Sequence, residues 1–243
     1  MRRRFFVEQF DSGAATLRGD GAEHLGRVLR AEPGQQYELS DGERVWLARV
    51  ERVSLPKRGE PAIEFALVER IEARASAPRV TLLISLIKFD RFEWCLEKAT
   101  ELGVSEIIPL TAERTDKPLI AAAGKRLERW SRILLESAQQ SRRLRPPVIR
   151  DAVRPAEAFA RASDARKILL SERRDARPLR DVLAGAGKQD HVALAFGPGG
   201  GWTDDEIAAA PASGFAEASL GENILRAETA VIATLAFVQL TLG

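Results

Sequence analysis

The feature that most constrains the fold of this chain is the nearly continuous apolar run RVTLLISL at residues 79–86. Such a run is typical of a strand that is buried on both faces, as in a parallel sheet. Further short apolar segments follow it at residues 104–110, 167–171, 191–196 and 216–220. Stretches with helical periodicity separate these segments. Strands that alternate with helices predict an α/β fold with a mostly parallel sheet.

The intervening helices are predicted from their start signals as well as from their periodicity. Asp90 and Glu93 have the spacing of a capping box at the start of one helix, and Thr203 and Glu206 have the same spacing at another. Apolar side chains recur along one stripe of a long amphipathic segment, and an apolar segment closes the chain. The two longest predicted helices therefore cover residues 122–143 and 227–242.

The N-terminal part of the chain has a different organisation. Short β-type apolar patterns lie at residues 45–53 and 62–71, and turn-forming residues separate them. At residues 73–78 the composition shifts to a linker-like sequence. These features predict a small β-rich domain at residues 1–72 and an α/β domain at residues 73–243.

Cysteine and histidine are scarce, with one cysteine, Cys95, and two histidines, His24 and His191. A single cysteine cannot form an intramolecular disulfide, and so few donors make a closed zinc site within one chain implausible. No stretch reaches the roughly 18 apolar residues that span a bilayer. Acidic residues follow the basic N-terminus where a signal peptide would be apolar. We therefore expect a cytoplasmic protein with no metal and no membrane partner.

The glycine run GPGGG at residues 197–201 follows a predicted strand and precedes a predicted helix. Glycine lets the backbone approach a ligand closely, and the amides at a helix start favour anions or acceptor atoms. The run lacks the lysine of a Walker A loop, and Trp202 stands where a dinucleotide fingerprint needs its last glycine. The residues alone leave two interpretations open, a ligand cradle of another kind or a tight turn between strand and helix.

Arg226, in the segment SLGENILRAETA at residues 219–230, stands at the predicted start of the last helix. A cation at this position opposes the helix dipole. A local rule that is broken without a structural reason points to function, as a hypothesis. The alternative is that Arg226 forms a surface ion pair with Glu228 or Glu222.

The positions of the arginines are more informative about possible partners than the net charge, which is only +2. Residues 137–150 include no acidic residue but contain Arg142 and Arg143, and Arg27 and Arg30 lie close together near the N-terminus. Clustered arginines are candidate phosphate contacts in a nucleic-acid-binding protein. A solvated basic face that complements a helix dipole is the alternative.

Several blocks of sequence, spread along nearly the whole chain, match one family in their order and spacing. The blocks are HLGRVLR (24–30), KFDRFEWCLEKATELGVSEIIPL (88–110), ESAQQSRR (136–143), FGPGGGW (196–202) and LGENILRAETA (220–230). They resemble the bacterial 16S ribosomal RNA uracil-N3 methyltransferases, the RsmE family of the SPOUT superfamily. Some positions depart from the family pattern: Gly199 and Gln139 replace glutamates, Arg142 replaces a glycine and Asn223 replaces an arginine.

The resemblance implies a fold, a cofactor and partners that the residues alone do not show. The fold would be a SPOUT-type parallel sheet with a C-terminal trefoil knot, preceded by a PUA-like β-barrel that helps to hold RNA. The cofactor would be S-adenosyl-L-methionine (SAM), bound in the knot. The protein would be a homodimer that acts on 16S rRNA or the small ribosomal subunit.

The resemblance also assigns residues to the site. The implied cofactor-binding residues are Leu170, Ser171, Glu172, Phe196, Gly197, Gly199, Gly200, Leu220, Gly221, Ile224 and Leu225. The candidate RNA contacts are Arg27, Arg30, Arg114, Arg142 and Arg143. The candidate catalytic residues are Arg226 and Glu228.

The implied reaction is methylation of N3 of a specific uridine, position 1498 of 16S rRNA. The N3 proton must leave, because the neutral imide nitrogen has no useful lone pair, and a preorganised cation would stabilise the resulting charge. We expect Arg226 to supply that cation, whereas Glu228, Glu172 and bulk water are alternative proton acceptors. Two other functions stay open. One is a non-catalytic homologue that binds SAM and RNA. The reason to consider it is Gly199, which stands in place of a glutamate of the family pattern. The other is a SPOUT enzyme that methylates a different rRNA or tRNA position.

Overall fold

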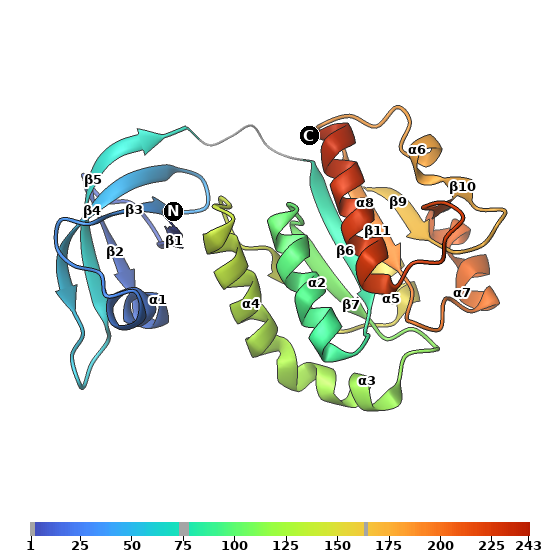
Figure 1. Cartoon of the computed structure of the whole chain (residues 1–243), viewed down its shortest axis with the longest axis horizontal. Coiled ribbons are helices and arrows are strands. Elements are labelled where there is room, and N and C mark those ends of the chain that lie inside the picture. The colour runs from blue at the N-terminus through green and yellow to red at the C-terminus, as the bar shows by residue number, and fades with distance from the viewer. Residues whose placement is uncertain (1–2, 73–77, 163–164) are drawn as a thin grey trace. The chain divides into compact units, whose positions relative to one another are not determined.

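The computed structural model describes residues 3–72, 78–162 and 165–243, and the chain forms two compact units. The N-terminal unit comprises Met1–Ala75 and Ala138–Pro146, and the C-terminal unit comprises Ser76–Ser137 and Pro147–Gly243. The expected domain boundary, between residues 72 and 73, adjoins residues 73–77, which lie outside the described residues. Figure 1 shows the elements of both units.

The N-terminal unit is built on one sheet. Its strands are β1 (Arg4–Phe6), β2 (Ala14–Arg18), β3 (Gln36–Ser40), β4 (Val45–Ser54) and β5 (Ala62–Ile71), with α1 (Gly19–Glu23) and the π-helix η1 (His24–Val28) after β2. The sheet order is β1-β3-β4-β5-β2, in which β1 and β3 run parallel and the other neighbours run antiparallel. Ile63 and Phe65 pack with Leu25 in the core of this unit. The strands predicted at residues 45–53 and 62–71 are confirmed.

Residues 138–146 pack with the N-terminal strands, although the expected domain division placed them in the second domain. The Ser40 hydroxyl donates a hydrogen bond to the carbonyl oxygen of Leu144 at 2.6 Å. The Arg4 guanidinium donates from Nη1 to the carbonyl oxygen of Arg142, also at 2.6 Å. The expected division assigned each continuous stretch of sequence to one domain. These hydrogen bonds instead join residues that are about a hundred residues or more apart along the chain.

The C-terminal unit contains a seven-stranded sheet. Its strands are β6 (Arg79–Ser85), β7 (Glu106–Leu110), β8 (Val148–Ile149), β9 (Arg166–Leu170), β10 (Arg177–Pro178), β11 (His191–Phe196) and β12 (Phe215–Ser219). The order is β10-β12-β9-β11-β6-β7-β8, and all neighbouring strands run parallel. Leu82 and Ile84 enter the core on one face, and Leu83 enters the core on the other. Burial of both faces explains the run of apolar residues at Leu82, Leu83 and Ile84 of β6.

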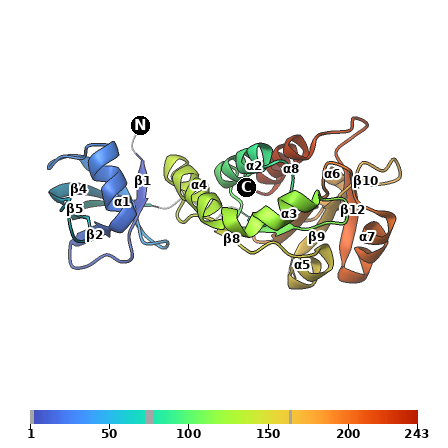
Figure 2. The same cartoon turned by 90° about the horizontal axis from the view of Figure 1, so that it is seen from below.

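Helices cover both faces of this sheet (Figure 2). They are α2 (Phe89–Glu101), α3 (Lys117–Ala123), α4 (Leu127–Gln140), α5 (Pro155–Arg161), α6 (Leu179–Val182), α7 (Asp204–Ala209) and α8 (Ala227–Leu242), with 3-10 turns η2 (Gly124–Arg126) and η3 (Pro211–Ser213). Leu96 of α2 and Leu235 of α8 pack in one core, and Phe159 of α5 packs in the other. The predicted α/β fold with a parallel sheet is confirmed. Among the described residues, no helix is both long enough and apolar enough to cross a membrane.

The predicted helix at residues 122–143 is shorter and starts later than its pattern indicates. A 3-10 turn at Gly124–Arg126 separates α3 from α4, and α4 ends at Gln140. Arg142 follows with a φ of 56°, in the left-handed region that residues other than glycine rarely adopt. The helix therefore ends three residues before the predicted end at residue 143.

The two predicted capping boxes have different outcomes. At α7 the Thr203 side chain accepts a hydrogen bond from the Glu206 amide and the Glu206 side chain accepts one from the Thr203 amide, so that box is confirmed. At α2 the residue before the helix is Lys88, and no side chain caps it. Glu93 instead pairs with the Arg129 guanidinium at 2.7 Å. The prediction at α2 is wrong because the helix begins at Phe89, which places Asp90 within its first turn, and because a partner distant in sequence binds the Glu93 carboxylate.

Candidate functional site

A cavity of about 690 Å³ opens at the carboxyl ends of the parallel strands in the C-terminal unit. The loops after β6, β7, β9, β11 and β12 line it. Ligands of open α/β sheets bind at this edge of the strands. The lining includes Leu170, Ser171, Glu172, Phe196, Gly197, Gly199, Gly200, Leu220, Gly221, Ile224 and Leu225. The structure therefore brings together in one cavity all the residues that the resemblance assigns to the cofactor.

The glycine loop, residues 197–201, packs tightly against Trp202. Trp202 is buried, and its Nε1 donates a hydrogen bond to the carbonyl oxygen of Leu170 at 3.0 Å. A Cβ atom on Gly197 would lie 3.2 Å from the Trp202 ring, which is tighter than ordinary van der Waals contact. Gly201 has a φ of 74°, which favours glycine. The shape of the loop therefore depends on glycine at both of its ends.

Gly199 differs from its neighbours in the loop. A Cβ atom there would meet nothing within 4 Å, and its φ lies outside the left-handed region. A side chain at position 199, such as the glutamate of the family pattern, would therefore fit without strain. The departure removes a carboxylate from the cavity but leaves the packing of the loop unchanged.

Arg114 and Glu206 join the glycine loop to the loop after β7. Arg114 Nη1 donates to the carbonyl oxygens of Gly200 at 2.9 Å and of Trp202 at 3.1 Å. Glu206 Oε1 accepts a hydrogen bond from the amide of Glu113 at 2.9 Å, while its other oxygen completes the capping box of α7. Arg114, a candidate RNA contact by resemblance, thus binds the backbone of the glycine loop.

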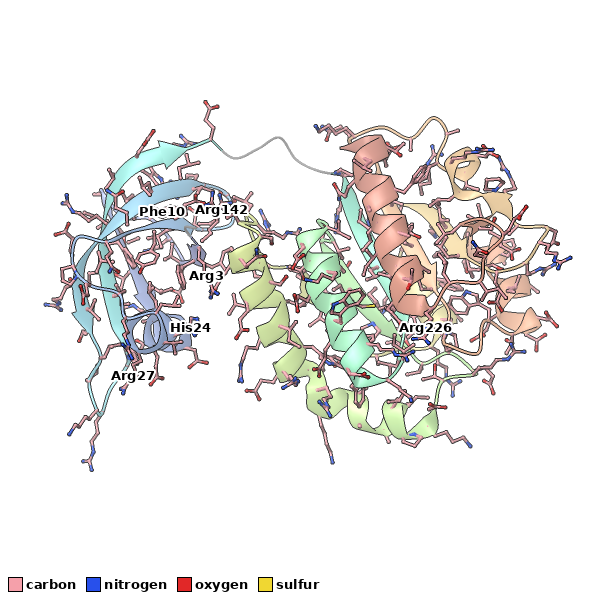
Figure 3. All side chains as sticks on the ribbon, in the orientation of Figure 1. Arg3, Phe10, His24, Arg27, Arg142 and Arg226 are labelled. Atoms are coloured by element: carbon pink, nitrogen blue, oxygen red, sulfur yellow. The ribbon has the colours of Figure 1, made fainter. Side chains whose placement is uncertain are left out.

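Arg226 directly precedes α8 (Figure 3). It is one of the residues that line the cavity. Within the part of the chain that the structure describes, no carboxylate lies at ion-pair distance from its guanidinium. Glu228, in the first turn of α8, pairs with Arg91 of α2 at 3.5 Å. The ion pair of Arg226 with Glu228 or Glu222 is therefore not formed, and the guanidinium remains exposed to a ligand.

The sequence reasoning missed polar residues of the loops that follow β6 and β7. Lys88, Thr115 and Asp116 line the cavity, and so does Arg91 near the start of α2. The available signal was that these residues closely follow apolar strands, because the segments at that edge carry ligands in α/β folds. Only the strand order, with β6 next to both β11 and β7, shows that these loops meet the glycine loop.

Cys95 is a packing residue of α2. It is fully buried, and burial raises the pKa of its thiol to about 12, with the nearby Glu228 carboxylate adding to the shift. A thiol with this pKa is protonated at neutral pH and is a poor nucleophile or metal ligand. In residues 3–72, 78–162 and 165–243, no three side chains of His, Cys, Asp or Glu gather as metal ligands do.

The other four candidate RNA contacts belong to the N-terminal unit. Arg27 and Arg30 are exposed, and Arg142 is exposed while its guanidinium lies 3.4 Å from the Glu38 carboxylate. Figure 3 labels Arg27 and Arg142. Arg143 is half-buried, and burial lowers the pKa of its guanidinium to about 10. Arg143 is therefore still charged at neutral pH but is less accessible than the others.

The sequence is similar to those of known RNA methyltransferases. A family model described as an RNA methyltransferase domain matches residues 75–239. Ribosomal RNA small subunit methyltransferase E of Synechocystis sp. is 34% identical over 233 residues, which cover 94% of this chain and 74% of that protein. The protein of the same name from Mycobacterium bovis is 31% identical over 239 residues, with 95% of this chain and 88% of that protein covered.

Solved structures resemble the chain over its whole length. A ribosomal RNA small subunit methyltransferase E from Neisseria gonorrhoeae, bound to S-adenosyl methionine, has a TM-score of 0.85 and 30% identity, with 100% of this chain and 99% of that chain covered. A putative methyltransferase from Legionella pneumophila, with bound SAM, has a TM-score of 0.84 and 28% identity, with 99% and 98% covered. The chain therefore belongs to the family of ribosomal RNA small subunit methyltransferase E.

Proposed function

We propose that this protein transfers a methyl group from SAM to N3 of a uridine in 16S rRNA, at position 1498. The family supports the coarser statement directly: the chain is a SAM-dependent rRNA methyltransferase. The observation that carries the proposal is one cavity that contains both the glycine loop and the exposed guanidinium of Arg226. A ribosomal substrate also supports the expected cytoplasmic location.

The cavity fits SAM in size and in lining. Its volume of about 690 Å³ falls in the range of roughly 300–1,000 Å³ that is usual for small-molecule sites. Leu170 and Leu220 offer apolar contacts, and Gly197 and Gly200 let the backbone approach a ligand closely. When bound, SAM supplies an electrophilic methyl group on a positively charged sulfur. The residues of the loop would hold it and exclude water from its reactive side.

Arg226 would stabilise the charge that develops on the uracil. As the N3 proton leaves, negative charge spreads to the ring oxygens, and a fixed cation next to them lowers the free energy of that state. Arg226 stands at the end of the loop that follows β12, directly before α8, which fixes its backbone. Because no described carboxylate neutralises its guanidinium, its full charge is available to the substrate.

The proton acceptor is assigned to Glu228, with Glu172 as the second candidate. Both carboxylates line the cavity. Glu228 pairs with Arg91 at 3.5 Å, which holds its carboxylate at the cavity. Bulk water remains the third route, because Arg226 would lower the pKa of the uracil itself.

The exposed arginines of the N-terminal unit would contact the RNA. Arg27, Arg30 and Arg142 have the charge and exposure that phosphate contacts need. Arg143 is half-buried, and Arg114 binds the glycine loop, so we assign both a supporting role in the proposed site. The partner would be 16S rRNA or the small ribosomal subunit.

A homodimer, a PUA-like barrel and a C-terminal trefoil knot remain proposals from the family resemblance. Support for the homodimer comes from Trp94 of α2 and Leu240 of α8, which are 45% and 88% exposed on neighbouring helices (Figure 1). Large apolar side chains on a surface mark interaction sites. Light scattering should show a dimer for the wild type and a monomer for Leu240→Glu. Val148→Glu, at an exposed apolar residue of β8, is the control that should remain dimeric.

Arg226 variants test the proposed function. In a single-turnover assay with labelled SAM and small ribosomal subunits, Arg226→Ala should slow methyl transfer by roughly 10²–10³-fold. The affinity for SAM should stay unchanged, and Arg226→Lys should recover part of the rate. If the wild type binds SAM but transfers no methyl group to the RNA, the protein is the non-catalytic homologue. Full activity of Arg226→Ala would remove Arg226 from the mechanism.

A further inference from the structure

A second cavity, of about 390 Å³, lies at the other edge of the same sheet, at the amino ends of β6, β7 and β11. The parallel register places His191 beside Arg79 and Thr81 beside Glu106. These four side chains, one or two from each of three adjacent strands, all line the cavity. We name this cavity the amino-edge hollow.

The floor of the amino-edge hollow is polar where the same sheet face is otherwise apolar. Side chains alternate between the two faces of a strand, so Arg79 and Thr81 share a face with Leu83. Leu83 packs in the core with Phe159 of α5. α5 ends at Arg161, which lines the hollow. The polar floor therefore begins where the helix that covers this face ends.

Positive charge predominates in the hollow. Among the residues that the structure describes, its lining contains Arg79, Arg150 and Arg161 and one carboxylate, Glu106. Arg150 Nε donates to Glu106 Oε1 at 2.7 Å, so Glu106 offsets one arginine and holds it in place. Arg161 pairs with Glu157 within its own helix, where both side chains are about half exposed. Such exposed pairs are weak and exchange readily with other partners.

Arg79 and Thr81 supply the groups that a ligand would meet. Arg79 is exposed and forms no ion pair with any carboxylate among the residues that the structure describes. Thr81 is 2% exposed, and its hydroxyl is hydrogen-bonded to His191 Nε2 at 2.9 Å, which fixes the imidazole on the floor. Arginines that converge on a polar floor match the charge and the several acceptor oxygens of a phosphate group.

We propose that the amino-edge hollow binds a phosphate group. If the proposed function is correct, the natural source is a backbone phosphate of the rRNA, held at the sheet edge opposite to the cavity that contains the glycine loop. The hollow would then add a contact in the C-terminal unit to those of the N-terminal arginines. A free phosphate ion has the same chemistry and is the alternative source.

A double variant with a matched control tests the binding of phosphate itself. Arg79→Ala with Arg161→Ala removes two arginines of the hollow. Arg132→Ala with Arg180→Ala removes two arginines of the same unit that are 63% and 77% exposed and line neither cavity. Inorganic phosphate is titrated at constant ionic strength, with chloride as reference, while backbone amide resonances are followed. Thermal melting of each variant confirms that it is folded.

Phosphate should give saturating shifts at Thr81, Arg150 and His191 in the wild type and the control. In the hollow variant the affinity should fall at least about tenfold, as expected when charge-assisted hydrogen bonds are lost. The second arm measures binding to small-subunit RNA across a salt series. Loss of one phosphate contact should reduce the salt slope by about one unit in the hollow variant only.

The two arms separate the sources and the possible failures. A response to both ligands supports an RNA phosphate, and a response to inorganic phosphate alone supports a small anion. The proposal is overturned if neither ligand distinguishes the hollow variant from the control. If the wild type fails to methylate RNA but keeps the phosphate shifts, the proposed function fails and the phosphate site stands.

Discussion

Arg114 Nη1 lies 2.9 Å from the carbonyl oxygen of Gly200 and joins the loop after β7 to the glycine loop after β11. The same nitrogen also reaches the carbonyl oxygen of Trp202, whose ring packs against Gly197. One guanidinium therefore fixes two carbonyls of a loop that has little side-chain volume of its own. This contact predicts that Arg114 positions the glycine loop for the proposed SAM site.

Arg114→Ala should weaken SAM binding without changing the salt dependence of RNA binding. Loss of two hydrogen bonds to the loop should cost about tenfold in affinity, or about 1.4 kcal/mol. Isothermal titration with SAM and an RNA-binding salt series measure the two effects separately. Arg132→Ala, at an exposed arginine of α4, should change neither. A smaller salt slope with unchanged SAM affinity would restore Arg114 as an RNA contact.

Two alanine substitutions in the glycine loop should have opposite effects on stability. Gly199→Ala should be neutral or stabilising by up to about 1 kcal/mol, because its Cβ enters open space and its φ suits alanine. Gly201→Ala should destabilise by more than about 1 kcal/mol, since φ there is 74° and the new Cβ would lie 3.3 Å from the Glu172 carboxylate. Urea unfolding measures both free energies. Equal effects would contradict the described conformation of the loop.

Glu38→Ala should strongly destabilise the N-terminal unit. Glu38 Oε2 accepts hydrogen bonds from Arg4 Nε and Nη2 at 3.1 and 2.9 Å, and both side chains are almost buried. Removal of the carboxylate leaves the Arg4 charge buried and unpaired, at a cost of about 3 kcal/mol.

Urea unfolding of Glu38→Ala is best compared with that of Glu64→Ala in the same sheet. Glu64 pairs with Arg52 on the surface, where both side chains are about half exposed or more. Loss of that pair should cost less than about 1 kcal/mol. Similar losses for the two variants would show that Glu38 is not the buried anchor described above.

The buried thiol of Cys95 should make stability depend on alkaline pH. Burial raises the pKa of this thiol to about 12, whereas an unfolded thiol titrates near about 8.5. Between these values the folded state retains a proton that the unfolded state releases. The free energy of unfolding should therefore fall as pH rises through this window, by up to about 1.4 kcal/mol per pH unit.

Comparison with Cys95→Ala isolates this effect from the titration of lysines and tyrosines. Urea unfolding from about pH 8 to about pH 10 should show a larger loss of stability for the wild type than for Cys95→Ala. The difference should grow steadily with pH. Parallel curves for the two proteins would exclude a raised thiol pKa.

Local signals predicted the parts of the fold that depend on neighbours in sequence. The apolar run at residues 79–86 indicated a strand with two buried faces, and β6 has them. The Thr203–Glu206 box at α7 was predicted correctly because both of its hydrogen bonds are local. Glu93 has the same spacing from Asp90, but Arg126 of η2 and Arg129 of α4 bind its carboxylate instead. Such long-range competition has no signature in a single helix start.

The candidate site was predictable mainly through resemblance. The residues alone left the glycine run as either a cradle or a turn, and left Arg226 either paired or free. Strand order then decides which loops meet, and that order places Lys88 and Thr115 beside the glycine loop. Arg114 binds the carbonyl oxygen of Gly200, which lies 86 residues further along the chain. No local sequence pattern predicts such a contact.

Mapping of the methylated nucleotide tests whether this protein methylates N3 of a uridine. Small subunits that lack the modification are incubated with the wild-type protein and SAM, and the RNA is then digested and analysed by mass spectrometry. We expect one added methyl group, on N3 of uridine 1498 of 16S rRNA. A methyl group on a ribose oxygen, on another nucleotide or on no nucleotide despite bound SAM would contradict it.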